Sequence, residues 1–251
     1  MNNAFDLAGK TAIVTGSCRG LGRGMAVGLA GAGADVVLVD RDEATDTAKV
    51  IESMGRKALT VSADLMSIEP IPSIMEKTLA AFGKVDILVN NAGTIRRTPA
   101  IDFSEKDWDD IMAVNAKTVF FFSQAVARDM VKRNSGKIIN IASLLSFQGG
   151  VFVPSYAASK GAVAQVTKAL ANEWASLGIN INAIAPGYME TDNTAPLRND
   201  PIRSKTILER IPAGRWGDPG DLQGAVVFLV SEASKYINGF TLAVDGGWLG
   251  R

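Results

Sequence analysis

Two side chains that could share a proton lie four residues apart, at Tyr156 and Lys160. The segment that follows, Ala162 to Ala175, is rich in Ala, Val and Leu and contains neither Gly nor Pro, which predicts a helix. Residues at i and i+4 share one face of a helix, so the phenol and the ammonium would point at the same small volume. A cation held close lowers the pKa of a phenol toward neutrality, where it can serve as a general acid/base.

A glycine-rich turn near the start of the chain predicts a phosphate-binding site. The β-branched run Thr11–Thr15 precedes Gly16, Gly20 and Gly22, and the Ala/Gly/Leu segment from Arg23 to Ala32 predicts a helix. Glycine lets the backbone approach a pyrophosphate, and a helix N-terminus offers free N–H groups. The spacing G-x-x-x-G-x-G departs from the common G-x-G-x-x-G fingerprint, and a tight strand–helix turn that needs small residues is the alternative reading.

Asp40, at the end of the next apolar run, Asp35 to Val39, predicts which dinucleotide binds. A carboxylate there can accept hydrogen bonds from the two ribose hydroxyls of the adenosine, and it would repel a 2′-phosphate. Arg19 and Arg41 could instead pair with that phosphate. Since a carboxylate against a phosphate sets like charges face to face, we expect the cofactor to be NAD.

The motifs of this chain and their order resemble those of the short-chain dehydrogenase/reductase family, and the resemblance extends over the full length of the chain. The matching pieces are Thr15-Gly16-x-x-x-Gly20-x-Gly22, Asn90-Asn91-Ala92-Gly93, Asn115, Ser143, Tyr156-x-x-x-Lys160 and Pro186-Gly187. The resemblance implies four catalytic residues, Asn115, Ser143, Tyr156 and Lys160. In it, Ser143 orients the substrate oxygen, Lys160 also holds the nicotinamide ribose, and Asn115 anchors a water in a proton relay.

The same resemblance, together with the glycine turn and Asp40, gives a set of expected cofactor-binding residues. These are Gly16, Ser17, Arg19, Gly20, Leu21, Gly22, Asp40, Asp64, Leu65, Asn91, Ala92, Gly93, Tyr156, Lys160, Pro186, Gly187 and Thr191. Two of them have a competing structural role, because Asp64 could form a turn or cap and Thr191 could be the N-cap of a helix.

Apolar, strand-like runs alternate with helical ones along the whole chain. Besides the two N-terminal runs, they are Lys57–Val61, Val85–Val89, Lys137–Ile141, Asn180–Ile184 and Thr241–Val244. Continuous apolar runs are typical of buried parallel strands, so we expect one doubly wound α/β domain over residues 1–251, with a seven-stranded parallel sheet. The polar interval Met189 to Arg210 reads as loop plus short helix and predicts a mobile lid over the site.

Arg96, Arg97 and Gln148 suggest an acidic sugar as the substrate. The arginines directly follow Asn-Ala-Gly, and Gln148 lies five residues past Ser143. An arginine fork suits a carboxylate, so these residues could bind a sugar acid beside Ser143 and Tyr156. The alternatives are a 3-oxoacyl thioester, another polyol or gluconate, or a non-catalytic protein that senses NAD.

Composition excludes several classes of function. The 251 residues include no histidine and one cysteine, so a Ser-His-Asp triad is impossible and a zinc site is disfavoured; we expect no metal, and Cys18 as a small filler. The formal net charge is zero, with 26 basic and 26 acidic residues, which predicts no nucleic-acid partner. The sequence has no apolar stretch of 18 residues, and residues Met1 to Asp6 do not resemble a signal peptide. We therefore expect a cytoplasmic protein without membrane contact.

A surplus of apolar surface on two helices predicts an assembly. The helix that carries Tyr156 and the expected helix Val114 to Ala127, with Phe120-Phe121-Phe122, have apolar residues around more of their circumference than one core contact needs. The family resemblance implies that these two helices form the main interface of a homotetramer, with the C-terminal segment Gly246 to Leu249 packing across another.

Overall fold

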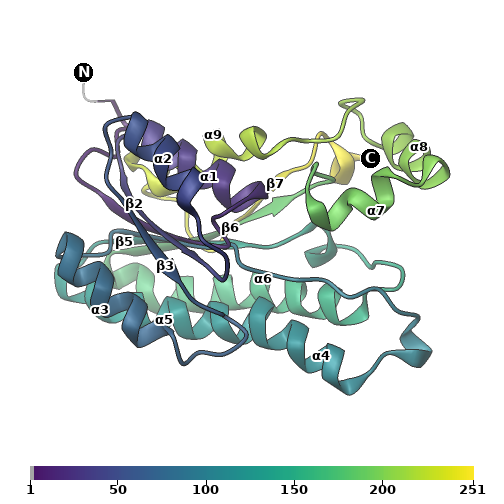
Figure 1. The fold of residues 1–251 in the computed structure, drawn as a ribbon, viewed down its shortest axis with the longest axis horizontal. Helices are drawn as coiled ribbons and strands as arrows, with labels where there is room; N and C mark the ends of the chain where they lie inside the picture. Colours follow the sequence, from purple (N-terminus) through teal and green to yellow (C-terminus); the bar gives the residue numbers. More distant parts are fainter. Residues whose placement is uncertain (1–2) are drawn as a thin grey trace.

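The structure is a computed structural model that describes residues 3–251, so residues 1 and 2 of the predicted domain lie outside the described part. Its centre is a seven-stranded parallel sheet with the strand order β3-β2-β1-β4-β5-β6-β7, which confirms the expected fold class (Figure 1). The strands are β1 (Thr11–Thr15), β2 (Asp35–Asp40), β3 (Ala58–Ser62), β4 (Ile87–Asn90), β5 (Gly136–Ile141), β6 (Ile179–Pro186) and β7 (Thr241–Val244). The order reverses at β1, which pairs with β2 on one side and β4 on the other.

Helices cover both faces of the sheet (Figure 1). One face carries α1 (Gly20–Gly31), α2 (Thr45–Ser53) and α9 (Gln223–Val230). The other carries α3 (Ile71–Phe82), α4 (Glu105–Met112), α5 (Thr118–Arg133) and α6 (Pro154–Trp174). Two further helices, α7 (Ala195–Arg198) and α8 (Pro201–Arg210), follow the carboxyl end of β6 and lie at the end of the molecule near the C-terminus.

The inner strands are largely apolar because both of their faces are buried. In β2, Val36 and Leu38 pack into the cluster that includes Met25 and Leu29 of α1, whereas Val37 and Val39 pack on the opposite face. All four strand residues are fully buried, and each contributes roughly 1.5–3 kcal/mol of hydrophobic stabilisation. The sheet is therefore a rigid base for the loops at its carboxyl edge.

A buried chain of hydrogen bonds joins the sheet to α6, the helix that carries Tyr156. Asn90 of β4 donates to Oδ1 of Asn140 on β5 at 2.9 Å, and Asn140 donates to Oγ1 of Thr167 on α6 at 3.0 Å. All three side chains are at most 3% exposed. Because unpaired polar groups are costly in the interior, this chain specifies how α6 sits on the sheet.

Two expectations about helices differ from the structure. The expected helix Val114 to Ala127 continues from α4 through a π-helical turn, Ala113–Lys117, and α5 runs on to Arg133. The interval Met189 to Arg210, predicted as a loop plus a short helix, contains two helices, the four-residue α7 and the ten-residue α8. The carboxylate of Asp200 caps α8 by accepting the N–H groups of Ile202 and Arg203, and Pro201 fills the first helical position.

Among residues 3–251, no helix combines the length and apolar composition needed to cross a bilayer.

Candidate active site

The glycine turn after β1 is shaped for close approach of a ligand to the backbone. Gly16 has φ +65°, and a Cβ added to Gly22 would lie 1.9 Å from the carbonyl oxygen of Gly16. Helix α1 then begins at Gly20, and no side chain caps its first N–H groups. Asn91 fixes the turn from the neighbouring strand, because its side-chain amide donates to the carbonyls of Thr15 at 2.9 Å and Gly16 at 3.0 Å. The turn therefore fits the pyrophosphate of a dinucleotide.

A cleft of about 380 Å³ opens above this turn at the carboxyl edge of the sheet. Most of the expected cofactor-binding residues line it: Gly16, Arg19, Gly20, Leu21, Asp40, Asp64, Leu65, Asn91, Ala92, Gly93, Tyr156, Lys160 and Thr191. Four do not. Ser17 is fully buried and bonds to Val39, Gly22 lies beneath the turn, and Pro186 and Gly187 line a neighbouring cavity instead.

Asp64 and Thr191 hold the structural roles that competed with cofactor binding, and both also face the cleft. The carboxylate of Asp64 accepts the N–H of Met66 at 2.9 Å, which closes a turn. Thr191 is the N-cap of the short 3₁₀ turn Asp192–Thr194. Neither role prevents a contact with a ligand in the cleft, where both residues lie.

Acidic groups dominate the adenosine end of the cleft. The carboxylate of Asp40 accepts the backbone N–H of Cys18 at 2.9 Å and that of Arg41 at 2.8 Å. Arg19 forms ion pairs with Asp42 at 3.5 Å and with Asp192 at 3.3 Å, so its charge is already partly balanced.

Cys18 lies beside these carboxylates and remains a thiol. Its Sγ and carboxylate oxygens of Asp40 and Asp42 lie within 4.8 Å of one another. Burial and hydrogen bonding with Asp40 raise the pKa of the Cys18 thiol to about 11. A protonated thiol is a poor metal ligand and a poor nucleophile.

Tyr156 and Lys160 meet on one face of α6, as their spacing predicts. The Nζ atom of Lys160 lies 5.6 Å from the centroid of the Tyr156 ring and donates a 2.6 Å hydrogen bond to the carbonyl of Ile141. Burial lowers the pKa of the Lys160 ammonium to about 8. Burial also raises the pKa of Tyr156, and hydrogen bonding with Ser143 and the charge of Arg97 oppose that rise. The sequence predicts that Lys160 lowers the pKa of Tyr156 toward neutrality; in the structure that pKa is raised, and the groups that oppose the rise are Ser143 and Arg97.

Asn115 is fully buried in the π-helical turn and fixes the loop after β4. Its side-chain amide donates to the carbonyl of Thr94 at 2.9 Å and to Oγ of Ser159 at 3.1 Å, and its Oδ1 accepts the N–H of Thr94 at 2.9 Å. These three hydrogen bonds hold the side chain of Asn115 against the loop after β4 and against α6.

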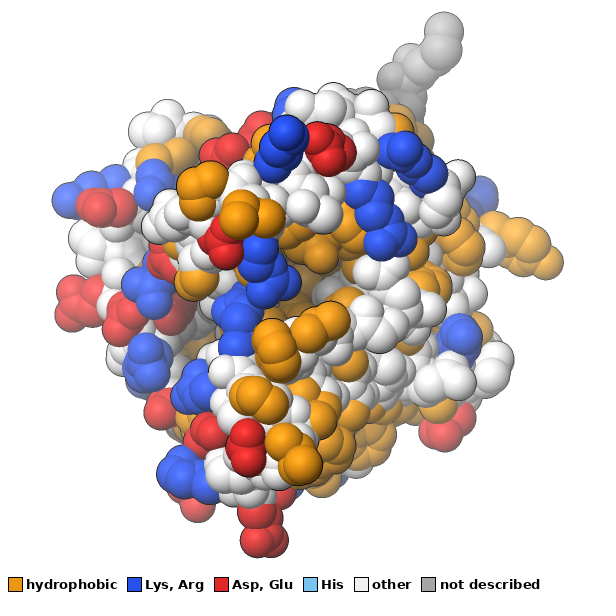
Figure 2. Space-filling model, turned by 90° about the vertical axis from the view of Figure 1, so that its right-hand side faces the viewer, with side chains coloured by type: hydrophobic (Ala, Val, Ile, Leu, Met, Phe, Trp, Pro, Cys, Tyr) orange, Lys and Arg blue, Asp and Glu red, His pale blue; other side chains and the backbone are white. Residues whose placement is uncertain are grey.

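Tyr156 stands where two cavities meet. It lines the cofactor cleft together with Lys160, and it lines a second cavity of about 820 Å³ together with Ser143. Figure 2 views the molecule from the side of α8 and shows a hollow with Lys and Arg side chains beside it. The arrangement puts a proton-transfer group between a dinucleotide site and a space for a second molecule.

The structure divides the expected substrate-binding residues. Arg97 and Gln148 line the second cavity, and Arg97 also donates to the carbonyl of Asn193 at 2.8 Å. Arg96 faces the cofactor cleft and forms an ion pair with Asp107 at 3.5 Å. Gln148 accepts the indole N–H of Trp248 at 3.1 Å.

Sequence reasoning missed the aromatic and cationic residues on α8 and packed around it that line this cavity. They are Tyr188, Arg203, Arg210 and Trp248. The pair Asp200-Pro201 is a helix-start signal, and it could have revealed the helix that presents the two arginines.

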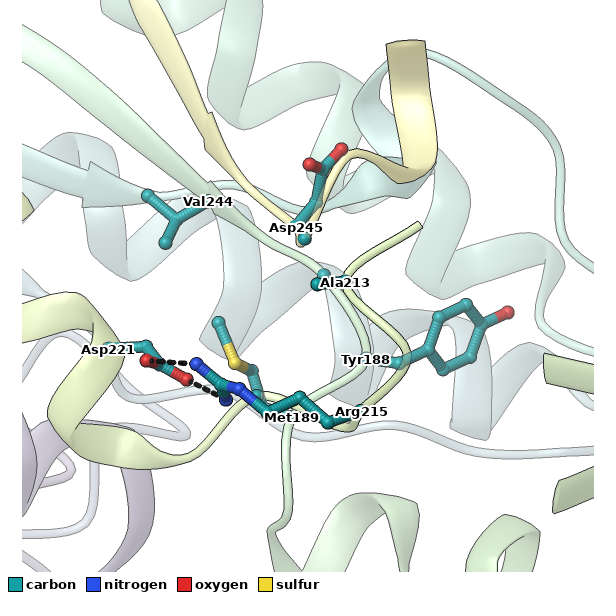
Figure 3. A pocket seen from close by; sticks show the side chains of 10 residues that line it. Tyr188, Met189, Ala213, Arg215, Asp221, Val244 and Asp245 are labelled. Carbon is teal, nitrogen blue, oxygen red and sulfur yellow. Dashed lines mark hydrogen bonds and ion pairs between the residues drawn. The ribbon is translucent and has the colours of Figure 1, made fainter. Parts of the chain in front are cut away.

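A third, smaller pocket of about 170 Å³ lies behind the turn at Gly187 (Figure 3). Arg215 points across it to Asp221 and binds that carboxylate in a bidentate ion pair, with hydrogen bonds of 2.6 and 2.8 Å. The hydrogen bonds from Arg215 lower the pKa of Asp221 to about 2. Asp221 is therefore ionised near neutral pH, and its charge is balanced by Arg215.

Comparison with known proteins decides the family. The sequence pattern of a family described as enoyl-(acyl carrier protein) reductase matches residues 16–249. The chain is 61% identical over 250 residues to the 2-dehydro-3-deoxy-D-gluconate 5-dehydrogenase of Dickeya dadantii (strain 3937), covering 99% of each. The chain belongs to the short-chain dehydrogenase/reductase family. It is therefore an oxidoreductase.

Solved structures of other members of this short-chain dehydrogenase/reductase family have the same fold. A protein from Agrobacterium tumefaciens, provisionally named as a 2-deoxy-D-gluconate 3-dehydrogenase and bound to NADP, has a TM-score of 0.91 and 52% identity, covering 100% of both chains. A gluconate 5-dehydrogenase from Burkholderia cenocepacia J2315, in complex with NADP and tartrate, has a TM-score of 0.94 and 42% identity, covering 99% of this chain and 98% of that one.

Less generic segments of this family member resemble the 2-dehydro-3-deoxy-D-gluconate 5-dehydrogenases, also called 2-deoxy-D-gluconate 3-dehydrogenases. They are residues 95–97, 103–110, 143–150, 211–217 and 244–249. The identity to the Dickeya dadantii enzyme confirms that likeness.

Proposed function

We propose that this protein is an NAD(H)-dependent dehydrogenase that interconverts a secondary alcohol and a ketone on a sugar acid, such as 2-dehydro-3-deoxy-D-gluconate or 2-deoxy-D-gluconate. The observation that carries the proposal is the position of Tyr156, which lines both the cofactor cleft and the cavity that holds Ser143. The names of the relatives support the substrate class.

The catalytic roles follow from that position. When bound, the nicotinamide supplies or accepts the hydride. Tyr156, as phenolate, takes the proton of the substrate hydroxyl, and in ketone reduction it returns it. Ser143 shares the developing charge on the substrate oxygen, because it lines the same cavity as Tyr156. Lys160 faces the cofactor cleft, where its ammonium can hold the nicotinamide ribose.

Two features support NAD over NADP. Asp40 and Asp42 both line the adenosine end of the cleft, where a 2′-phosphate would face their negative charges. The guanidinium of Arg19 is paired with Asp42 at 3.5 Å, and that of Arg41 lies 4.0 Å from the same carboxylate. The two solved relatives hold NADP, and a comparison of kcat/KM with NAD and with NADP tests the preference of this protein.

The residues around the cavity also support a mobile lid over residues 189–210, and the partly buried rings of Phe120 and Phe121 on α5 support a homotetramer. Asn193 and Thr194 of that interval line the cavity, so a movement there would open or cover the substrate.

The test is a panel of alcohols assayed by NADH formation in the near ultraviolet. It includes 2-deoxy-D-gluconate, D-gluconate and uncharged polyols, with a 3-oxoacyl thioester assayed in the reducing direction. We expect the sugar acids to have the highest kcat/KM. A higher kcat/KM for the polyols or the thioester would overturn the substrate class, and NADH formation with none of the alcohols would overturn the activity.

A further inference from the structure

Helix α8 presents one cationic face to the substrate cavity. Arg203, Thr206, Ile207 and Arg210 all line it, at the i, i+3, i+4 and i+7 spacing of one helix face. Ile207 is 7% exposed and packs into the cluster that contains Trp248, which anchors this face. Lys205 and Glu209 are outside the lining and pair with each other at 3.9 Å.

The guanidinium groups in this cavity lack the carboxylate partners that other arginines of the chain have. Arg96 pairs with Asp107 and Arg215 with Asp221 (Figure 3). Within residues 3–251, neither Arg203 nor Arg210 has a carboxylate oxygen within 4.0 Å, and the described lining contains no Asp or Glu.

The cavity arginines also act on one another. The charge of Arg203 lowers the pKa of Arg97, after the larger effect of burial. The charges of Arg203 and Arg210 both act on Tyr188. Like charges gathered at one cavity oppose each other, and a bound anion would relieve that repulsion.

Arg210 is already oriented for such an anion. Its guanidinium carbon lies 4.0 Å from the centroid of the Trp248 ring. The indole N–H of Trp248 is in turn held by Gln148, which lies on the loop after Ser143. Stacking on an aromatic ring engages the face of a guanidinium and leaves its N–H edge for a carboxylate.

We propose that Arg203 and Arg210 form the receptor for the carboxylate of the substrate, with Arg97 beside the reacting carbon. This inference rests on the proposed sugar-acid function. In this proposal α8 provides the specificity for acids. The carboxylate of the bound substrate attracts the arginines of α8 and so moves the helix toward the substrate. A guanidinium group can bind a carboxylate through two parallel N–H···O hydrogen bonds, which fix the orientation of the ligand as well as adding affinity.

The experiment compares an acid with its uncharged analogue. D-gluconate and D-gluconamide are titrated into the NADH-loaded enzyme, and binding is followed by tryptophan fluorescence, since Trp248 lies in the cavity wall. The variants are Arg203→Gln, Arg210→Gln and the double variant. Lys205→Gln, on the other face of the same helix, is the matched control, and Arg203→Lys tests whether charge alone suffices.

We expect the wild-type enzyme to bind gluconate about tenfold or more tightly than gluconamide. Each Gln variant should lose most of that preference because it binds gluconate more weakly, while its affinity for gluconamide is unchanged. Lys205→Gln should keep it, and Arg203→Lys should keep part of it. Equal weakening of acid and amide, or a preference that survives the double variant, would overturn the receptor.

The same measurements separate this inference from the proposed function. If the wild-type enzyme binds gluconate in preference to gluconamide but oxidises no sugar acid, the proposed function is wrong and the carboxylate receptor stands. If both Gln variants oxidise sugar acids with an unchanged KM for the acid, the carboxylate receptor is wrong and the proposed function stands.

Discussion

The hydroxyl of Ser146 donates a 2.7 Å hydrogen bond to the backbone carbonyl of Lys160. The same hydroxyl accepts the backbone N–H of Ser143 at 3.3 Å. One small side chain therefore joins the loop that carries Ser143 to the helix that carries Tyr156 and Lys160. It acts through its neighbours, as a positioning residue.

Ser146→Ala should slow turnover without weakening cofactor binding. The loss of one hydrogen bond of about 1 kcal/mol would loosen the Ser143–Tyr156 contact and lower kcat roughly threefold to tenfold. The alkaline midpoint of the pH–rate profile should also rise, because Ser143 lowers the pKa of Tyr156. Ser146→Thr, which keeps the hydroxyl, should restore both. An alanine variant with the wild-type rate and profile would show that Ser146 only closes a turn.

Tyr156→Phe should remove nearly all turnover and leave NAD affinity within a few fold, because it deletes the acid/base group and little else. Steady-state kinetics and NAD titration measure the two quantities. Retention of more than about a tenth of the rate would contradict the role of Tyr156. Lys160→Ala should impair both turnover and cofactor binding, and a pure rate effect would refute its contact with the ribose.

Arg97→Gln should move the pH dependence of alcohol oxidation to higher pH. The positive charge of Arg97 opposes the rise in the pKa of Tyr156 that burial causes, so its removal raises that pKa further. The phenolate then forms only at higher pH, and the midpoint of the rise in kcat/KM shifts upward. Arg96→Gln, one residue away but facing the cofactor cleft, should leave the midpoint where it is. A downward shift in Arg97→Gln would reverse the sign of this argument.

Asp40→Ala should narrow the preference for NAD over NADP. We expect the wild-type enzyme to favour NAD by at least about tenfold in kcat/KM, the effect of one discriminating contact of about 1.4 kcal/mol. Removing the carboxylate takes away the acceptor for the ribose hydroxyls and one of the negative charges that a 2′-phosphate would face, while Arg19 and Arg41 stay beside Asp42. A wild-type preference for NADP would show that the arginines outweigh Asp40.

Sedimentation should give a mass of about four times the 26.5 kDa chain at micromolar concentration. In α5, Phe122 is fully buried, while Phe120 and Phe121 are only partly buried, with ring centroids 5.2 Å apart. One subunit therefore does not cover all three rings, and a second helix would bury the remainder. A fully active monomer would contradict the predicted assembly.

The sequence predicts the sheet well because each buried strand is a continuous apolar run. Asp35 to Val39 and Lys137 to Ile141 lie within a residue of the observed strands. A short helix was predicted within Met189 to Arg210, but not the bounds of α8, because its apolar positions are few and its charged residues resemble a loop. Its start depends on the cap at Asp200, a local signal that hydrophobic periodicity does not include.

The candidate site was predictable wherever a motif fixes both residue type and place. Tyr156 and Lys160 meet because helical spacing alone requires it. The pKa of Tyr156 was not predictable in the same way, since it depends on burial and on Arg97, a residue 59 positions away in the sequence. Arg203 and Arg210 likewise join the site only through tertiary packing.

The Asn91 contact with the glycine turn also sets an order of events during synthesis. The turn and Asp40 leave the ribosome early, but the side chain that secures the turn is 75 residues further along than Gly16. Strand β1 must likewise wait for Ile87 to Val89 before its second edge is paired. Pairing between distant segments is slow to form. The nascent cofactor turn therefore spends part of translation without the amide that holds it, and a dinucleotide can favour the folded chain only after that delay.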